Sequence, residues 1–290
     1  MIFFTSFCQA KIITSIKPLG FITEAIASGV SETDVLLPDG ASPHTYSLKP
    51  SDLIKLNSAD LIIWVGEDME TFMPSVLKDI DNNKTIELTE YPTIEALLKS
   101  GEKHGELNHA DEHHAHHEHG RFDNHIWLSP KIAEISAQII HDKLQKIYPQ
   151  KAALLEQNLH DFLINLKQTE QNIAKKLNSV QNKGYFVFHD SYAYFEAQFN
   201  LNNLGSFTIN PSIQPGLKKI YEIQKELKNR NAVCIFREPQ FSPVIVNKLI
   251  DGTNVKVGEL DPLGMDIVMT KDAYCKFLLK ITQQLLNCLE

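Results

Sequence analysis

The chain lacks several of the features by which common protein classes are identified. No apolar run approaches the roughly 20 residues that a helix needs to cross a bilayer. There is no Walker A loop, no glycine-rich dinucleotide fingerprint and no HExxH zinc-protease motif. The formal net charge of −8 also provides no excess of basic residues for nucleic acid or an anionic membrane. We therefore expect neither nucleic acid nor membrane lipid as the partner.

Cysteine is scarce as well, with four in 290 residues. Cys8 lies in the apolar stretch 1–10, which ends in a small–x–Ala pattern and is typical of the end of a secretory signal peptide cleaved after Ala10. A buried N-terminal strand is the alternative. A lipid-anchored Cys8 is less expected, because the bulky Phe7 precedes it. An exported chain beginning after Ala10 would keep Cys234, Cys275 and Cys288, enough for one disulfide whose partners remain open at this point.

The order of apolar patterns predicts the fold class. Short buried-type runs alternate with amphipathic segments along most of the chain, which is typical of βαβ units with mostly parallel sheets. Strands are expected at 11–16, 35–37, 61–65, 85–88, 185–188, 207–209, 232–236 and 255–260. Helices are expected at 18–29, from Pro50, through Met73 and Leu77, after Pro130, and at 149–178, 193–199, 216–229, 240–250 and 272–288.

One of these predicted helices is unusually long. Residues 149–178 contain no internal glycine or proline, and their apolar residues fall close to one stripe. A helix of that length would measure about 42 Å and could bridge two domains. We therefore predict a signal peptide at 1–10, an α/β lobe at 11–148 with a histidine-rich loop at 104–121, a linking helix at 149–180 and a second α/β lobe at 181–290.

The segment between His104 and His119 has a different composition. Seven of its sixteen residues are histidine, and four are acidic. It has no apolar period, so we expect it to stay outside the folded core. Such a tract suggests a protein that handles a metal ion. Its histidines, which we expect to bind metal ions weakly, are His104, His109, His113, His114, His116, His117 and His119.

Three further histidines occur among apolar or strand-ending residues. His44 lies in a loop between a predicted strand and a helix, His125 lies among aromatic and aliphatic residues, and His189 ends a predicted strand. Ligands of parallel sheets bind beyond the carboxyl ends of the strands, where these residues and Asp261 are expected. Three imidazoles with a water or one carboxylate favour four-coordinate Zn²⁺. Neighbouring polar groups are expected to hold the second ring nitrogens.

The order of these motifs resembles the ZnuA family, the periplasmic zinc-binding components of high-affinity zinc ABC importers. The resemblance rests on seven segments: 41–52 with His44, 61–66, the acidic and histidine-rich tract, 122–130 with His125, 184–195 with His189, 210–216 and 260–264. It implies two α/β lobes joined by one long helix, with zinc bound in the cleft between them.

The resemblance also implies roles for particular residues. The zinc ligands of the family fall on His44, His125 and His189. Some members offer a carboxylate just before the first histidine, where this chain has Pro43, so the fourth ligand is expected to be water or Asp261. The family's disulfide falls on Cys234 and Cys288 and leaves Cys275 free. The implied function is capture of zinc by a periplasmic monomer and its delivery to an inner-membrane permease with its ATPase, without catalysis.

Two other functions fit parts of the sequence. Three histidines and a water also form zinc hydrolase sites, and residues 109–113 match the HxxEH spacing. That motif requires a helix, whereas here it lies in a low-complexity run, and no motif places a general base. A surface adhesin of the same fold is the third interpretation, and it would be favoured by a lipid anchor on Cys8.

Overall fold

Two parallel sheets with the same strand order form the centre of the molecule. The computed structural model describes residues 11–100, 122–208, 217–229, 232–241 and 244–290. The first sheet has the order β2-β1-β3-β4 and the second the order β6-β5-β7-β8. All strand pairs are parallel. The expected α/β class with two sheets flanked by helices is therefore confirmed.

The first lobe is built around the first sheet, whose central strands β1 and β3 are buried except for Lys11. Its strands are β1 (Lys11–Thr14), β2 (Glu32–Val35), β3 (Leu61–Trp64) and β4 (Thr85–Glu87). Its helices are α1 (Lys17–Ala27), α2 (Pro50–Ser58), α3 (Pro74–Leu77), α4 (Pro92–Glu95) and α5 (Pro130–Ile147), with short 3₁₀ turns η1 (Asn82–Lys84), η2 (Leu88–Glu90) and η3 (Ile126–Leu128).

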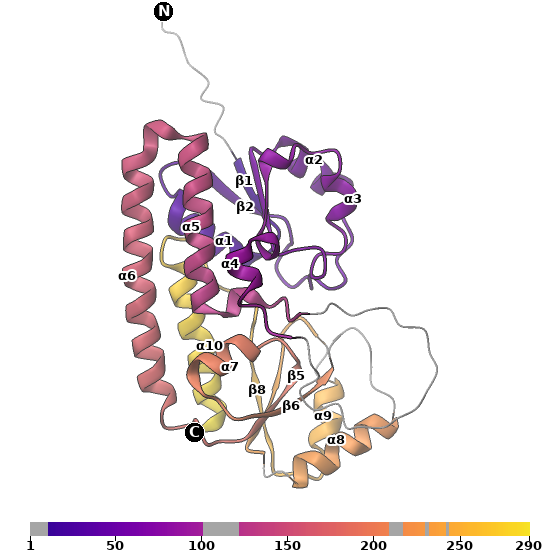
Figure 1. The fold of residues 1–290 in the computed structure, drawn as a ribbon. Helices are drawn as coiled ribbons and strands as arrows, with labels where there is room; N and C mark the ends of the chain where they lie inside the picture. Colours follow the sequence, from indigo (N-terminus) through magenta and orange to yellow (C-terminus); the bar gives the residue numbers. More distant parts are fainter. Residues whose placement is uncertain (1–10, 101–121, 209–216, 230–231, 242–243) are drawn as a thin grey trace, which may run out of the picture.

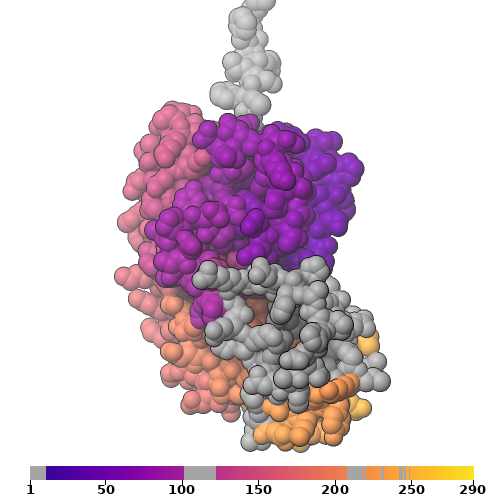
Figure 2. All heavy atoms as spheres, turned by 45° about the vertical axis from the view of Figure 1, so that its right-hand side comes forward, coloured from indigo at the N-terminus to yellow at the C-terminus, as the bar shows by residue number. Residues whose placement is uncertain are grey.

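The second lobe repeats this arrangement. Its strands are β5 (Tyr185–His189), β6 (Asn203–Thr208), β7 (Cys234–Arg237) and β8 (Lys256–Glu259). Its helices are α7 (Ala193–Phe199), α8 (Leu217–Asn229), α9 (Val244–Ile250) and α10 (Ala273–Leu289). In the space-filling view, the indigo-to-magenta residues of the first lobe lie above the orange residues of the second (Figure 2).

A long helix connects the two lobes. After the 3₁₀ turn η4 (Pro149–Lys151), α6 (Ala152–Leu177) runs alongside both sheets (Figure 1). It packs against α1 and α5 of the first lobe and against α10 of the second. The buried stripe that includes Leu155, Phe162 and Ile173 explains why this segment folds as one helix. At 26 residues it is about 39 Å long, close to the predicted length.

The hydrophobic core is continuous between the lobes. Alternation along β5 places Tyr185 and Val187 in a cluster shared with the first lobe, whereas Phe186 and Phe188 face a smaller cluster in the second. The ring centroids of Phe21 in α1 and Phe277 in α10 are 5.9 Å apart across the boundary. The lobes are therefore joined by packing as well as by a linker.

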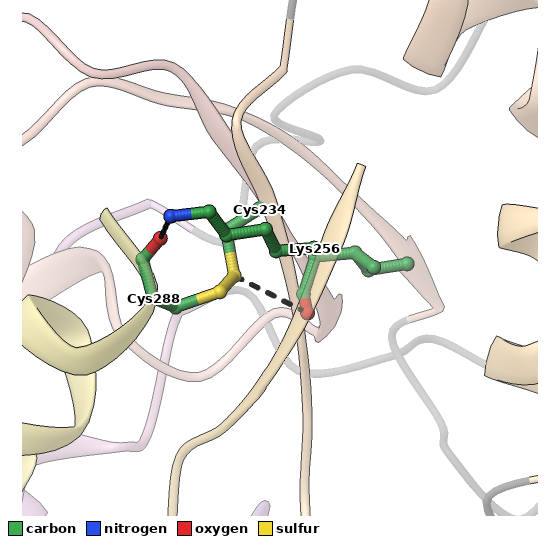
Figure 3. The surroundings of a disulfide bond; sticks show 4 residues. Cys234, Lys256 and Cys288 are labelled. Atoms are coloured by element: carbon green, nitrogen blue, oxygen red, sulfur yellow. Dashed lines mark hydrogen bonds between the residues drawn. A yellow bond between two sulfur atoms is a disulfide. The ribbon is translucent and has the colours of Figure 1, made fainter. Parts of the chain in front are cut away.

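A disulfide joins β7 to the last helix. Cys234 and Cys288 are bonded, with Cα atoms 6.1 Å apart, and the Lys256 ammonium donates to the Cys288 carbonyl at 3.3 Å (Figure 3). This is the pairing that the family resemblance implies. Cys275 is free and buried, and burial raises the pKa of its thiol.

Some predicted elements are shorter or shifted. The helix expected through Met73 and Leu77 is a single turn from Pro74 to Leu77, and β6 begins at Asn203, four residues before its predicted start. The proposed signal peptide and the histidine-rich tract lie outside the described residues. No helix within those residues is both long and apolar enough to cross a membrane.

Candidate metal centre

His44 comes from the loop between β2 and α2. A turn closed by a hydrogen bond from the Ala41 amide to the Pro38 carbonyl redirects the chain after the strand. The His44 amide then donates to the Ser42 hydroxyl at 3.4 Å. The side chain is partly buried, and Pro43 fills the position before it.

His125 lies immediately before η3 and is buried. One carboxylate oxygen of Asp123 accepts a hydrogen bond from its backbone amide at 3.0 Å and contacts its ring Nδ1 at 2.7 Å. A carboxylate can only accept, so Nδ1 carries the proton and Nε2 keeps its lone pair for a metal. Asp123 therefore fixes both the position and the tautomer of His125.

His189 is the last residue of β5, which pairs with β6 on one side and with β7 on the other. Glu238 follows β7, and its Oε1 contacts the His189 Nδ1 at 3.0 Å. The hydroxyls of Ser191 and Tyr192 donate to the same oxygen at 3.1 and 3.3 Å. The chain order of the sheet reverses between β5 and β7, which is where parallel sheets bind ligands.

The three rings converge. One ring nitrogen of each histidine lies within 4.8 Å of those of the other two. The Nε2 atoms of His44 and His125 are 3.3 Å apart, and two nitrogens bound to one tetrahedral zinc ion are separated by about 3.3 Å. The buried Nε2 of His189 has no hydrogen-bond partner among the described residues. Three ring nitrogens are thus placed to bind one ion.

The space around the rings is small and largely apolar. The cavity of about 10 Å³ accommodates a body the size of one ion or water. The ring of Trp127 packs edge-on against that of His125, with the ring centroids 5.3 Å apart. The ring centroids of Phe241 and His189 are 6.4 Å apart. Pro262 and Leu263 complete the wall on the second lobe. His125 and His189 are buried and His44 is partly buried, which strengthens the interaction of their imidazoles with a cation.

The histidines differ in their affinity for protons. Burial, together with the nearby His189 and His125, holds the pKa of His44 well below its ordinary value. Burial would also lower the pKa of His189, but the Glu238 carboxylate, together with Asp190 and Asp123, outweighs burial and raises that pKa. A proton therefore competes with a metal more strongly at His189 than at His44.

Asp261, the candidate fourth ligand, does not join this group. Its Oδ1 accepts hydrogen bonds from the backbone amides of Leu263 and Gly264 and from the Gln240 side chain, and its Oδ2 accepts from the Met265 amide at 2.7 Å. Asp261 thus stabilises the turn that forms part of the cavity wall. Gln240 also lines the cavity, and its buried Oε1 has no partner among the described residues.

The sequence interpretation did not identify Asp123 and Glu238 as the groups that orient the rings. For Asp123 a signal was present, because it stands two residues before His125 in a turn and can reach both the amide and the ring. Glu238 had no comparable signal, since 49 residues separate it from His189. Only the pairing of β5 with β7 brings the two together.

Three imidazoles, two of them held by carboxylates, form a site for a borderline divalent ion such as zinc. The fold and the site together define a two-lobed α/β metal-binding protein. Residues 12–288 match the family model of ZnuA, described as zinc-uptake complex component A, periplasmic, and the chain belongs to this family. It is therefore a periplasmic zinc-uptake component of the solute-binding class and not an enzyme.

Individual relatives agree with this assignment. The chain is 48% identical to the high-affinity zinc uptake system protein ZnuA of Yersinia pestis, over 97% of this chain and 92% of that protein. A crystal structure of ZnuA superposes with a TM-score of 0.81 at 27% identity, covering 97% of this chain and 100% of the other. A zinc-bound ZnuA deletion mutant gives a TM-score of 0.79 at 25% identity, with coverages of 97% and 98%.

Proposed function

We propose that His44, His125 and His189 bind one zinc ion between the lobes, with water in the fourth position. The observation that carries this proposal is the convergence of one nitrogen from each ring within 4.8 Å. The Nε2 atoms of His44 and His125 are 3.3 Å apart, as two nitrogens bound to one tetrahedral zinc ion would be. The Nδ1 contacts of His125 and His189 with carboxylates support the same assignment, because they leave Nε2 free to bind.

The family works with a zinc ABC permease and its ATPase. In the proposed cycle, this chain acts as a monomer, captures zinc in the periplasm and releases it on docking to the permease. Docking shifts the lobes slightly relative to one another and weakens the site. The continuous core supports a small movement, since a wide hinge opening would expose apolar surface that both lobes share.

A zinc titration of the metal-stripped protein against a strong competing chelator tests the ligand set. We expect one tight site, and we expect His189→Ala to weaken it at least about a hundredfold. His160→Ala is the matched control, because His160 is an exposed histidine of α6. Retention of the tight site in the His189→Ala protein would refute the assignment.

We further propose that the histidine-rich tract binds additional zinc weakly and acts as a collector or sensor. The support is its composition, with seven histidines and four acidic residues between His104 and His119. The residues that flank the tract lie next to the three-histidine site, because Asp123 contacts His125. Ser100 pairs with Phe122 in an antiparallel bridge, and the Asp123 amide donates to the Lys99 carbonyl at 2.9 Å.

Deletion of residues 104–119 tests this second proposal. We expect the tight site to remain, whereas the total zinc bound per chain and uptake in zinc-poor medium should decrease. A chain with the seven histidines replaced by asparagine keeps the loop length and serves as the matched variant. Unchanged stoichiometry and uptake in both variants would leave the tract as a surface loop without this role.

A further inference from the structure

The loop that carries His125 belongs to the first lobe but is held by the second. The Tyr194 hydroxyl donates to the Asp123 carbonyl at 2.6 Å. The Trp127 indole donates to the Pro262 carbonyl at 2.7 Å, and the Tyr274 hydroxyl donates to the Trp127 carbonyl at 2.8 Å. Three hydrogen bonds between the lobes therefore fall on one segment of five residues.

The residues that make these bonds flank His125 at equal distances in the sequence. Asp123 stands two residues before His125 and Trp127 two residues after it. The two phenols come from separate elements of the second lobe, Tyr194 from α7 and Tyr274 from α10. Tyr274 and Trp127 are almost fully buried, and Tyr194 is 5% exposed. Water therefore cannot easily replace either hydroxyl.

The same two residues contact the ring of His125. Asp123 presents its carbonyl to Tyr194 and its carboxylate to the His125 Nδ1. Trp127 presents its carbonyl to Tyr274 and packs its indole against the His125 ring. A displacement of the second lobe would therefore act on the groups that orient this ring.

Tyr194 has an additional contact at the base of this loop. Its hydroxyl accepts a hydrogen bond from the Lys99 amide at 3.1 Å while it donates to the Asp123 carbonyl. The Lys99 ammonium donates to the Ala193 carbonyl at 3.0 Å. One phenol thus fixes both chain segments that flank the tract, and it fixes them to α7.

We propose that Tyr194 and Tyr274 are positioning residues for His125. They control the lifetime of bound zinc by coupling the orientation of the His125 ring to the relative placement of the lobes. The inference rests on the proposed function, because it requires His125 to be a zinc ligand. It identifies the bonds through which a partner that separates the lobes would loosen the site. His189 needs no such coupling, since it lies in the second lobe itself.

The variants Tyr194→Phe and Tyr274→Phe remove only the hydroxyls. The zinc-loaded proteins are mixed with excess chelator, and the rate of zinc transfer is measured by stopped flow. One lost buried hydrogen bond should accelerate release about threefold to tenfold in each variant. Tyr185→Phe is the matched control: Tyr185 is equally buried, but its hydroxyl donates to Glu196 at 2.9 Å within the second lobe.

A purely structural role would lower the melting temperature of all three variants and leave the release rate at the wild-type value, which would overturn the proposal. The second test places each substitution in a His125→Ala background and measures zinc affinity by competition. The effect of Tyr194→Phe and Tyr274→Phe should disappear there, because the ring through which they act is absent. A persisting effect would also overturn it.

The two hypotheses fail differently in these experiments. Unchanged zinc affinity of His125→Ala alone would refute the ligand set and the positioning role together. Weakened affinity of His125→Ala combined with wild-type release from both phenylalanine variants would leave the ligand set in place and refute only the positioning role.

Discussion

Glu238 accepts three hydrogen bonds on one carboxylate oxygen, and one of these comes from His189. Glu238→Gln keeps the shape of the side chain but removes the charge that orients and polarises the ring. Loss of such a partner typically weakens metal binding by roughly 10- to 100-fold. We expect a decrease of that size in the zinc competition assay. Glu259→Gln on β8, at a partly exposed carboxylate paired with Arg237, should bind zinc as the wild type does.

The pH dependence of zinc binding follows from the same contact. The raised pKa of His189 means that a proton occupies this ring already at pH values above its ordinary 6.5, and zinc must displace it. Zinc affinity should therefore begin to fall above pH 6.5 as the solution is acidified. Glu238→Gln removes the group that raises this pKa, so the onset should move to lower pH. An unchanged onset would show that another group controls the proton competition.

Gly264 tests the packing between the lobes at a single position. Its φ is +66°, and an added Cβ would lie 2.8 Å from Phe21 and 3.0 Å from Phe277. Gly264→Ala should lower the free energy of unfolding by about 2–4 kcal/mol in urea denaturation, through backbone strain and overpacking. Gly40 also has a positive φ, but an added Cβ there would meet nothing within 4 Å. Gly40→Ala should therefore cost only about 1 kcal/mol.

At the residue scale, the sequence predicted which side chains converge better than it predicted what orients them. His44, His125 and His189 could be selected because each follows or ends an apolar element, where loops of parallel sheets meet. Asp261 satisfied the same criterion, yet its carboxylate accepts amides of its own turn. Strand-end position indicates nearness to a site, but it does not show which way a side chain points.

Among the elements, the disulfide between β7 and α10 lies at the amino end of β7, and Glu238 lies past its carboxyl end. The bond closes a loop of 54 residues, for which chain entropy predicts a stabilisation of about 4 kcal/mol. Cys234→Ser with Cys288→Ser should lower the melting temperature and leave zinc affinity unchanged. Cys275→Ser, at the free buried thiol, is the control for loss of a cysteine without loss of the bond.

The long and strongly patterned elements were predictable, and the short ones were not. The apolar stripe of α6 and the apolar runs of β3 and β5 are visible within each segment, and these patterns predict the helix and the two strands. The single turn α3 and the early start of β6 depend on neighbours distant in sequence. The β6 register shifts opposite Tyr185 and Phe186, where Gly205 pairs with β5. Such an irregularity has no periodic signal in the sequence.

At the scale of the whole molecule, the stability of the metal-free protein should fall as pH rises from 5 to 8. Burial raises the pKa of Glu70 to about 7, despite hydrogen bonds from Ser15, Gly66 and Val65. A carboxyl whose folded pKa exceeds its unfolded value of 4.5 stabilises the fold below 4.5, and this contribution is lost as pH rises through about 7. For Glu70 the difference corresponds to roughly 3 kcal/mol.

Other groups act in the same direction. Burial also raises the pKa of Glu196 to about 7, and it is the main cause of the raised pKa values of Glu24, Glu87 and Glu170. The lowered pKa of His44 opposes them, because its contribution is lost as pH falls below 6.5. Urea unfolding at several pH values measures the combined effect of these groups on the free energy of unfolding. Glu70→Gln should make the fall between pH 5 and 8 shallower without abolishing it, because Glu196 still contributes, whereas substitution of the exposed neighbour Glu67 by glutamine should not change it.

The relation between the lobes was only partly contained in the sequence. The break in pattern around 149–184 indicated two α/β units, and the helix between them was long enough to join both. The shared core could not be predicted, because helices α1 and α10 are separated by most of the chain and each has an apolar face that would fit many partners.

That contact between α1 and α10 also affects how the protein is made. The first helix of the fold is covered by the last one, with Phe21 against Phe277. The core cannot be completed until residues 273–289 have been synthesised, and contacts of such long sequence separation form slowly. A polypeptide that stays open until its final helix is available remains extended long enough to be threaded through a narrow channel. For a protein that works in the periplasm, slow closure is thus compatible with crossing a membrane before folding.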